Sequence, residues 1–121
     1  MPGGVGAVPA PMVATTGPFK DQNYKRLIDD LITEESRAWM VNQYQKGSVT
    51  NDQVKRDGQG RPTEVDANYG YMGMGRPYKG SVRVTFRNGA PECIYFSDFP
   101  TTCRAPNPRV ISAYERQQYA N

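Results

Sequence analysis

The chain has 121 residues, the length of one ordinary domain, with 37% apolar residues and a mean hydropathy of -0.72. Its net charge is +3, and 15 basic residues are interspersed with 12 acidic ones, so it lacks the concentrated basic patch of a typical duplex-binding domain. It contains no histidine, which excludes Ser–His and Cys–His nucleophile pairs and every zinc site that needs an imidazole. Two cysteines are too few for a Cys₄ metal site.

The first 18 residues predict a disordered tail or linker, because glycine and proline alternate there without hydrophobic periodicity. We expect residues 19–121 to form a single domain. No apolar run approaches the ~18 residues that a transmembrane helix needs. Residues 1–18 also lack the basic start and the continuous apolar stretch of a signal peptide, and they resemble the linker that follows one. A signal peptide is therefore expected to be absent from this chain.

Residues 21–46 predict helix, with Asp21 as the N-cap and Gly47 after the last turn. Apolar side chains recur there at three- and four-residue steps and form one stripe: Tyr24, Leu27, Ile28, Leu31, Ala38 and Trp39. Glu35 interrupts this stripe, so two arrangements are open. One is a single helix, and the other is a break at Thr33 followed by a second helix that turns Ala38, Val41 and Tyr44 inward. The polar residues after Thr33 suit a helix start and favour the break.

The stretch from residue 47 to residue 79 contains one clear signal, a turn at Asp57–Gly60. Residues 54–56 and 63–65 are expected to flank that turn as short strands. Residues 69–75 read YGYMGMG, and their glycines disfavour both helix and regular strand. This segment is therefore predicted to be a flexible loop lined by tyrosines.

A β-hairpin is predicted over residues 81–97. Val82, Val84 and Phe86 alternate with polar residues, and Asn88-Gly89 is the preferred pair for a type I′ turn. Counting back from a two-residue turn pairs Arg87 with Ala90 and Val84 with Cys93, so we expect Cys93 and Tyr95 to lie on the Val82/Val84 face. Pro91 removes a backbone donor, which indicates an edge or a bulge.

Residues 99–106 are predicted to form a rigid loop, and a final helix follows it. Asn107 suits the N-cap and Pro108 the first helical position. The apolar stripe of this helix consists of Val110, Ile111 and Tyr114. Together these elements predict an α+β fold: an N-terminal helix or helix pair packed on a small antiparallel sheet, with a C-terminal helix.

Cys93 and Cys103 are predicted to form a disulfide, since they lie close together in a chain that has no other cysteine. Closing this short loop stabilises a domain by roughly 2–3 kcal/mol on the chain-entropy model. A disulfide also indicates an oxidising compartment, so we expect an exported protein, periplasmic or extracellular. The bond would hold an aromatic bend firm, and preorganised surfaces of that kind favour recognition.

One surface is predicted to bind a partner. Its members are basic and aromatic side chains of the hairpin region: Arg76, Tyr78, Lys79, Arg83, Arg87, Tyr95 and Phe99. Arginine beside tyrosine suits recognition of a carboxylate, a phosphate or an aromatic surface. The function we expect is therefore a non-enzymatic module that docks to a larger protein or envelope assembly, as an accessory subunit. Oligomeric state is not predictable from these features.

The sequence leaves two alternative functions open. The first is nucleic-acid binding through the basic strand 76–87, where residues 79–86 match part of the RNP1 motif of RNA recognition domains. Ser81 and Arg83 replace the aromatic residues that stack on bases in that motif. The second is a carboxylate hydrolase based on Glu35, which needs another carboxylate nearby. Neither a complete phosphate loop nor a calcium loop is present, so no cofactor and no metal is expected.

Overall fold

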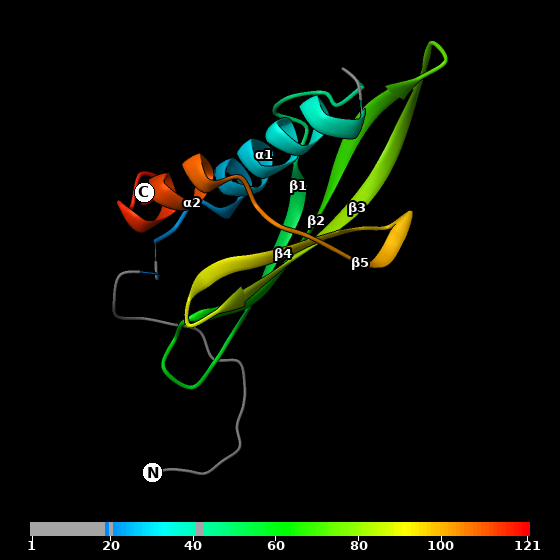
Figure 1. Ribbon diagram of the computed structural model, residues 1–121. Coiled ribbons are helices and arrows are strands. Elements are labelled where there is room, and N and C mark those ends of the chain that lie inside the picture. The colour runs from blue at the N-terminus through cyan, green and yellow to red at the C-terminus, as the bar shows by residue number, and fades with distance from the viewer. Residues whose placement is uncertain (1–18, 20, 41–42) are drawn as a thin grey trace.

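The computed structural model describes residues 19, 21–40 and 43–121, with only the backbone at residues 39 and 40. Two helices and five strands follow one another along these residues (Figure 1). They are α1 (Tyr24–Glu35), which continues into a π-helical turn (Ser36–Met40), then β1 (Thr50–Arg56), β2 (Pro62–Gly73), β3 (Arg76–Arg87), β4 (Ala90–Phe96), β5 (Phe99–Arg104) and α2 (Pro108–Glu115). The tail predicted at residues 1–18 lies outside the described residues. No described helix is both long enough and apolar enough to cross a membrane.

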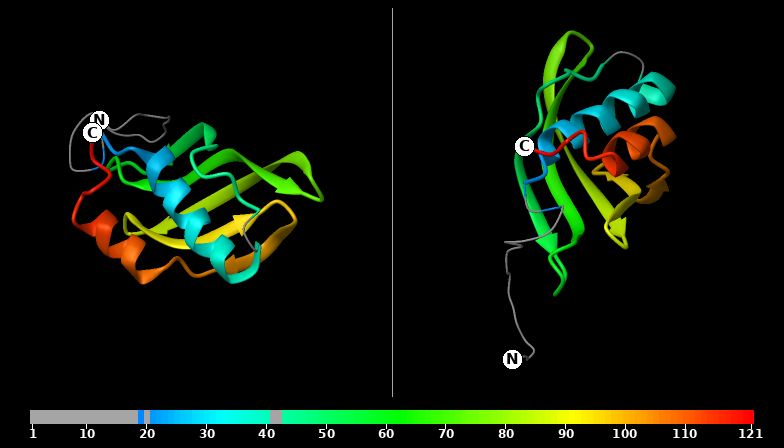
Figure 2. Two further views of the ribbon diagram at one scale, coloured as in Figure 1. Left: turned by 90° about the horizontal axis from the view of Figure 1, so that it is seen from above. Right: turned by 90° about the vertical axis from the view of Figure 1, so that its left-hand side faces the viewer.

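The five strands form one antiparallel sheet in the order β1-β2-β3-β4-β5, and α1 and α2 cover the same face of it (Figure 2). This arrangement confirms the predicted α+β fold. The core lies between the helices and the sheet. Its largest side chains of less than 2% exposure are mainly aliphatic and come from α1 and the three central strands: Leu27, Ile28, Leu31, Ile32, Pro62, Val65, Val84, Ile94 and Phe96.

Helix α1 begins two residues later than expected. Asn23 is the N-cap, and its side chain accepts a hydrogen bond from the backbone N–H of Arg26 at 3.1 Å, so the prediction of Asp21 was wrong. The break at Thr33 is also wrong, because Thr33 lies inside α1 and its hydroxyl donates to the carbonyl of Asp29 at 2.7 Å. The helix changes at Ser36 instead, where its turns widen to π geometry.

The residues predicted to form the inward face of a second helix do not do so. Ala38 is exposed, and Tyr44 pairs as an isolated β-bridge with Tyr71. Val41 lies outside the described residues. Gly47 does not follow a helix but occupies a turn with φ +85°.

The turn at Asp57–Gly60 joins β1 and β2, as predicted. Asp57 stabilises it, because its Oδ1 accepts hydrogen bonds from the backbone N–H groups of Gln59 and Arg61 at 2.8 and 2.9 Å. The flanking strands are longer than predicted, since β2 continues without interruption to Gly73.

The predicted flexible loop at residues 69–75 is wrong. Strands β2 and β3 pair residue by residue from Glu64↔Thr85 to Gly73↔Arg76 and turn only at Met74-Gly75. The glycines are needed because tyrosine rings lie across them. A Cβ at Gly80 would lie 2.5 Å from Cζ of Tyr69, and one at Gly73 would lie 3.1 Å from Cε2 of Tyr78.

We expect Gly80→Ala to lower the free energy of unfolding by about 1–2 kcal/mol, as overpacking does elsewhere. The Tyr69 ring that the new methyl group would meet is only 4% exposed, and its contacts with the rings of Tyr44, Tyr71 and Phe96 oppose a shift. Gly58→Ala is the matched control, because a Cβ there meets nothing within 4 Å and its φ is not positive. Urea unfolding of both variants measures the difference, and equal stability of the two would contradict the packing described here.

The β3–β4 hairpin turns at Asn88-Gly89, both with positive φ, as a type I′ turn requires. Arg87 pairs with Ala90 as predicted, but a bulge then follows. Pro91 pairs with Phe86 and Cys93 with Thr85, so Glu92 has no cross-strand partner on β3. The bulge that Pro91 indicated is therefore present.

This extra residue reverses the faces of β4, because a shift of one residue exchanges the two sides of a strand. Ile94 and Phe96, at 0% and 2% exposure, enter the core. Cys93 and Tyr95 point to the opposite side, so their predicted position on the Val82/Val84 face was wrong.

The rigid loop predicted at residues 99–106 is in part a strand. β5 forms the edge of the sheet and pairs with β4 only at Phe96↔Phe99 and Ile94↔Arg104. The predicted disulfide between Cys93 and Cys103 joins these two strands, with the Cα atoms 5.0 Å apart. Helix α2 begins as predicted, with Asn107 as the N-cap and Pro108 in the first turn.

Candidate binding surfaces

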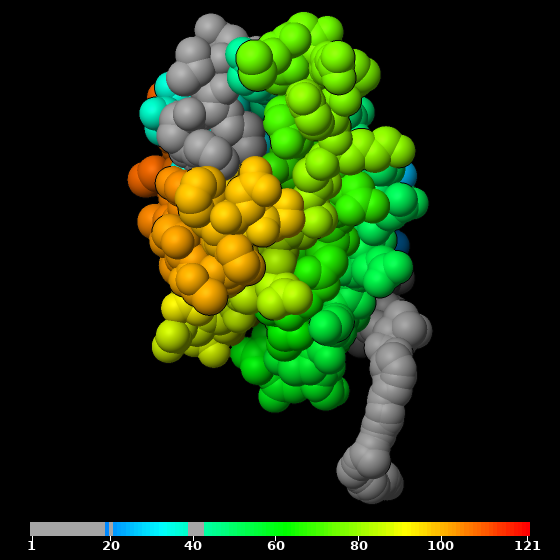
Figure 3. Space-filling model, turned by 90° about the vertical axis from the view of Figure 1, so that its right-hand side faces the viewer, coloured from blue at the N-terminus to red at the C-terminus, as the bar shows by residue number. Residues whose placement is uncertain are grey.

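The sheet face that the helices leave uncovered is called the open face here. Figure 3 looks onto it, with β1 and β2 in green at one side and β5 in orange at the other. Strand alternation places polar side chains of four strands on this face: Gln53, Lys55, Glu64, Asp66, Asn68, Ser81, Arg83 and Tyr95. It is therefore a polar surface supported by a well-packed core.

Four charged side chains form a network on the open face. Nε of Arg83 lies 3.2 Å from Oδ1 of Asp66 and 3.4 Å from Oε2 of Glu64, and Nζ of Lys55 lies 3.2 Å from the same Glu64 oxygen. The carboxyl of Asp66 and then burial raise the pKa of Glu64, against the opposing effect of Lys55 and Arg83. Two cations face two carboxylates, so the network as a whole is close to neutral.

The carboxylates that the structure brings together are thus Glu64 and Asp66, a pair that sequence reasoning missed. They are two residues apart on β2, so they share a face only once residues 62–73 are known to be a strand. The sequence predicts a strand only over residues 63–65, which includes Glu64 but not Asp66.

A groove of about 600 Å³ crosses the open face. The residues that line it come from β1, β2, β3, β4, the β4–β5 turn and the start of β5. A second hollow of about 420 Å³ adjoins it, because Asn68 lines both. The second hollow extends toward the tip of the β2–β3 hairpin.

The far end of the β2–β3 hairpin, residues 69–80, is called the arm here. β1 pairs with β2 only as far as Asn68, and β4 pairs with β3 only as far as Val82, so the arm extends past both neighbouring strands (Figure 1, Figure 2). Residues 43–45 support one edge of it, through hydrogen bonds of 3.0 Å from the N–H of Gln45 to the carbonyl of Gly70 and of 2.7 Å from the N–H of Met72 to the carbonyl of Gln43.

The tip of the arm is apolar and aromatic. Met74 is 98% exposed, and the rings of Tyr71 and Tyr78 stack with their centroids 5.5 Å apart. Arg76 and Lys79 lie beside them, and neither forms an ion pair with another residue in the described part of the chain. The arm thus combines exposed apolar area with two available cations.

The seven predicted binding residues lie in three places rather than on one surface. Arg76, Tyr78 and Lys79 belong to the arm. Arg83, Arg87 and Tyr95 point to the open face or its rim, where Arg83 pairs with Asp66 and Arg87 Nε lies 2.7 Å from Oε2 of Glu92. Phe99, 46% exposed, starts the edge strand β5, and the guanidinium of Arg104 lies 5.7 Å from its ring centroid.

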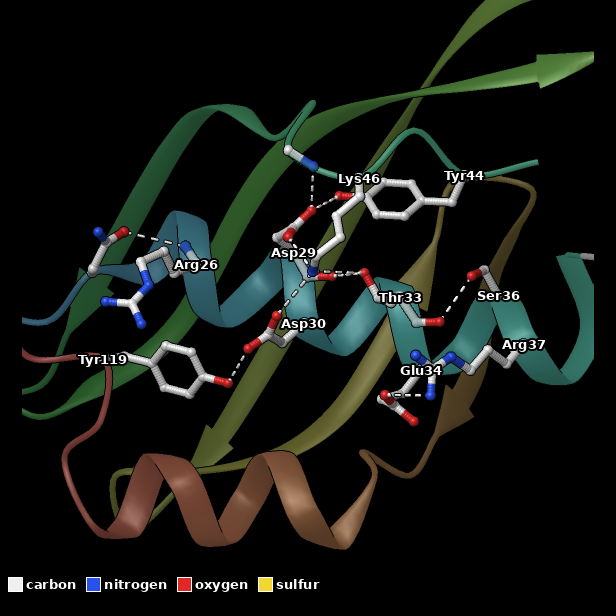
Figure 4. Close-up of polar contacts among 12 residues, drawn as sticks. Arg26, Asp29, Asp30, Thr33, Glu34, Ser36, Arg37, Tyr44, Lys46 and Tyr119 are labelled. Carbon is white, nitrogen blue, oxygen red and sulfur yellow. Dashed lines mark hydrogen bonds and ion pairs between the residues drawn. The ribbon is translucent and has the colours of Figure 1, made fainter. Parts of the chain in front are cut away.

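A separate polar cluster on α1, called the clamp here, holds the segment before β1 (Figure 4). Oδ1 of Asp29 accepts hydrogen bonds from the hydroxyl of Tyr44 at 2.5 Å and the backbone N–H of Gly47 at 2.6 Å. Nζ of Lys46 donates to Oδ2 of Asp29 at 2.9 Å. Burial is the largest single influence on the pKa of Asp29 and raises it, but these bonds together outweigh burial and lower that pKa.

The clamp also reaches the C-terminal residues. Lys46 lies 3.2 Å from Oδ1 of Asp30, and the hydroxyl of Tyr119 donates to Oδ2 of the same carboxylate. Burial and then Asp30 raise the pKa of Tyr119. The two adjacent aspartates share Lys46 and differ in their other partners, and their oxygens are occupied by hydrogen bonds. The clamp is therefore a structural connection and not an acid/base pair.

Within the described ranges no three histidine, cysteine, aspartate or glutamate side chains gather as a metal site would require. The fold and these surfaces define a class of protein: a small α+β domain with a five-stranded meander, a disulfide at its edge strand and a projecting hairpin. No protein-family model, curated protein or solved structure matches the chain.

Proposed function

We propose that the protein is a non-enzymatic, exported binding module that docks to a larger protein through the arm. The observation that carries this proposal is the tip of the β2–β3 hairpin, where the almost fully exposed Met74 stands beside the stacked Tyr71 and Tyr78. Tyrosine, methionine and arginine are enriched in protein interfaces, where a few such residues carry most of the binding energy. The disulfide supports an oxidising compartment.

The charges of the arm specify the chemistry of the partner. Arg76 and Lys79 would meet carboxylates at the rim, while the methionine and the tyrosines would enter an apolar centre. A nucleic-acid partner is supported less well. Arg83 and Arg87 belong to the strand that would bind it, yet both are already paired with carboxylates.

The test compares substitutions of exposed apolar side chains within the arm and outside it. We expect Met74→Ser/Tyr78→Ser to weaken capture of the main partner from host extract at least thirtyfold, because truncated hot-spot residues cost about 2 kcal/mol or more. Phe99→Ser is the matched control, since Phe99 is 46% exposed and Tyr78 43%. Arg83→Glu/Arg87→Glu is expected to retain capture. A photocrosslinking amino acid at position 78 of the otherwise wild-type protein should react with the same partner.

Two results would overturn this proposal. One is equal recovery of partners by the wild type and the Met74→Ser/Tyr78→Ser variant. The other is binding of random RNA or DNA at low salt that Arg83→Glu/Arg87→Glu abolishes, because the phosphate contribution is strongest there and would assign the basic strand to nucleic acid.

A further inference from the structure

The groove on the open face is a separate feature, and most of its polar side chains are uncharged hydrogen-bonding groups. Three carboxamides line it, Asn51, Gln53 and Asn68, together with the hydroxyl groups of Ser81 and Ser97. Among residues 19, 21–40 and 43–121, no hydrogen bond occupies any of the three side-chain amides. Each of these amides can both donate and accept.

These groups are held in a regular array. Asn68 and Ser81 are direct cross-strand partners, and Gln53 pairs with Asp66, two residues before Asn68. Neighbouring strands are about 4.8 Å apart, and alternate residues of a strand about 6.6–7 Å apart. The array therefore offers paired donors and acceptors at short, fixed intervals. Because a second hollow continues from Asn68, the site suits an elongated ligand.

The charges in the groove cancel. Asp66 and Arg83 are the charged residues that line it, and they lie 3.2 Å apart in an ion pair. An anionic ligand would meet the carboxylates of Asp66 and Glu64, and a cationic ligand would meet Arg83. Neither a cationic nor an anionic ligand therefore gains net electrostatic attraction from this site. Hydroxyl groups of a neutral ligand, in contrast, can form charge-assisted hydrogen bonds with both Asp66 and Arg83.

An aromatic ring completes the lining. Tyr95 is the cross-strand partner of Arg83 and is half-buried on the open face. Its ring presents apolar area beside polar groups, which suits a ligand with both C–H surface and hydroxyl groups. From this juxtaposition we propose that the groove binds a neutral oligosaccharide. The volume of about 600 Å³ lies within the usual range of ligand sites.

The test uses the full, disulfide-bonded chain labelled with ¹⁵N and titrated with cellohexaose, maltohexaose and hexa-N-acetylchitohexaose, all neutral, followed by NMR. At least one neutral sugar should shift the side-chain NH₂ signals of Gln53 and Asn68. We expect Gln53→Ala/Asn68→Ala to weaken that binding about tenfold, as loss of two hydrogen bonds implies. Gln59→Ala/Gln118→Ala is the matched control, because these exposed carboxamides lie outside the groove lining.

Three outcomes overturn the assignment: no groove signal moves with any of the three sugars, the groove variant binds as tightly as the control, or hexagalacturonate binds while the neutral sugars do not. Met74→Ser should leave sugar binding unchanged, since Met74 is not among the residues that line either hollow. A negative result for sugar binding in the groove can therefore be distinguished from a negative result for partner binding by the arm.

Discussion

Asp29→Ala is expected to lower the free energy of unfolding by about 3 kcal/mol, one of the two largest effects in this protein. The substitution removes three hydrogen bonds at once, from Tyr44, Gly47 and Lys46. Hydrogen bonds to a charged group contribute about 1.5–3 kcal/mol each, and partial exposure of Lys46 reduces their sum. Chemical denaturation at pH 7 measures the loss.

The effect should depend on pH. The pKa of Asp29 is lower in the folded protein than in the unfolded chain, because the bonds to its carboxylate outweigh its burial. The stabilisation is therefore complete above the unfolded pKa of about 4 and is lost as the pH falls through the lower, folded pKa. The difference in stability between wild type and Asp29→Ala should shrink over that range.

Asp21→Ala is the control for this experiment. Asp21 is an exposed aspartate just before α1, and the N-cap is Asn23 instead. We expect its replacement to change stability by less than about 0.5 kcal/mol. If Asp21→Ala were as damaging as Asp29→Ala, or if the effect of Asp29→Ala did not vary below pH 4, the role given to the clamp would be incorrect.

The Cys93→Ser/Cys103→Ser variant is expected to lose about 2–3 kcal/mol and to release β5 from the sheet. β5 pairs with β4 at only two positions, so the covalent bond carries much of its attachment. Hydrogen exchange should accelerate at residues 99–104 and stay slow at the core strands β2 and β3. The arm belongs to β2 and β3, and partner capture through it should persist.

Chemical modification of the two cysteines in the wild-type protein provides the control for the double variant. Reduction followed by alkylation should reproduce the stability of the double variant, whereas a thiol probe added to the native, unreduced protein should label neither cysteine. Free labelling of both cysteines without reductant would remove the support for an exported protein. Unchanged exchange at residues 99–104 after reduction would show that hydrogen bonds alone hold the edge strand.

The sequence alone determined the features that depend on neighbouring residues. The apolar stripe of α1, the type I′ turn at Asn88-Gly89, the N-cap at Asn107 and the cysteine pair all follow from local rules of periodicity, positive φ and capping. Those rules act over a few residues, and they were sufficient for the fold class and for most turns.

Only the tertiary structure decided which side chains meet. Glu92 is an inconspicuous residue, yet as the extra residue of a bulge it turns Tyr95 to the open face and Phe96 to the core. The glycines of the arm indicate a loop until Tyr69 is seen to lie across Gly80, eleven positions away. Asp29 binds partners 15 to 18 residues distant. Such contacts depend on strand register and helix placement, which local sequence does not encode, so the arm, the clamp and the groove could not have been found from it.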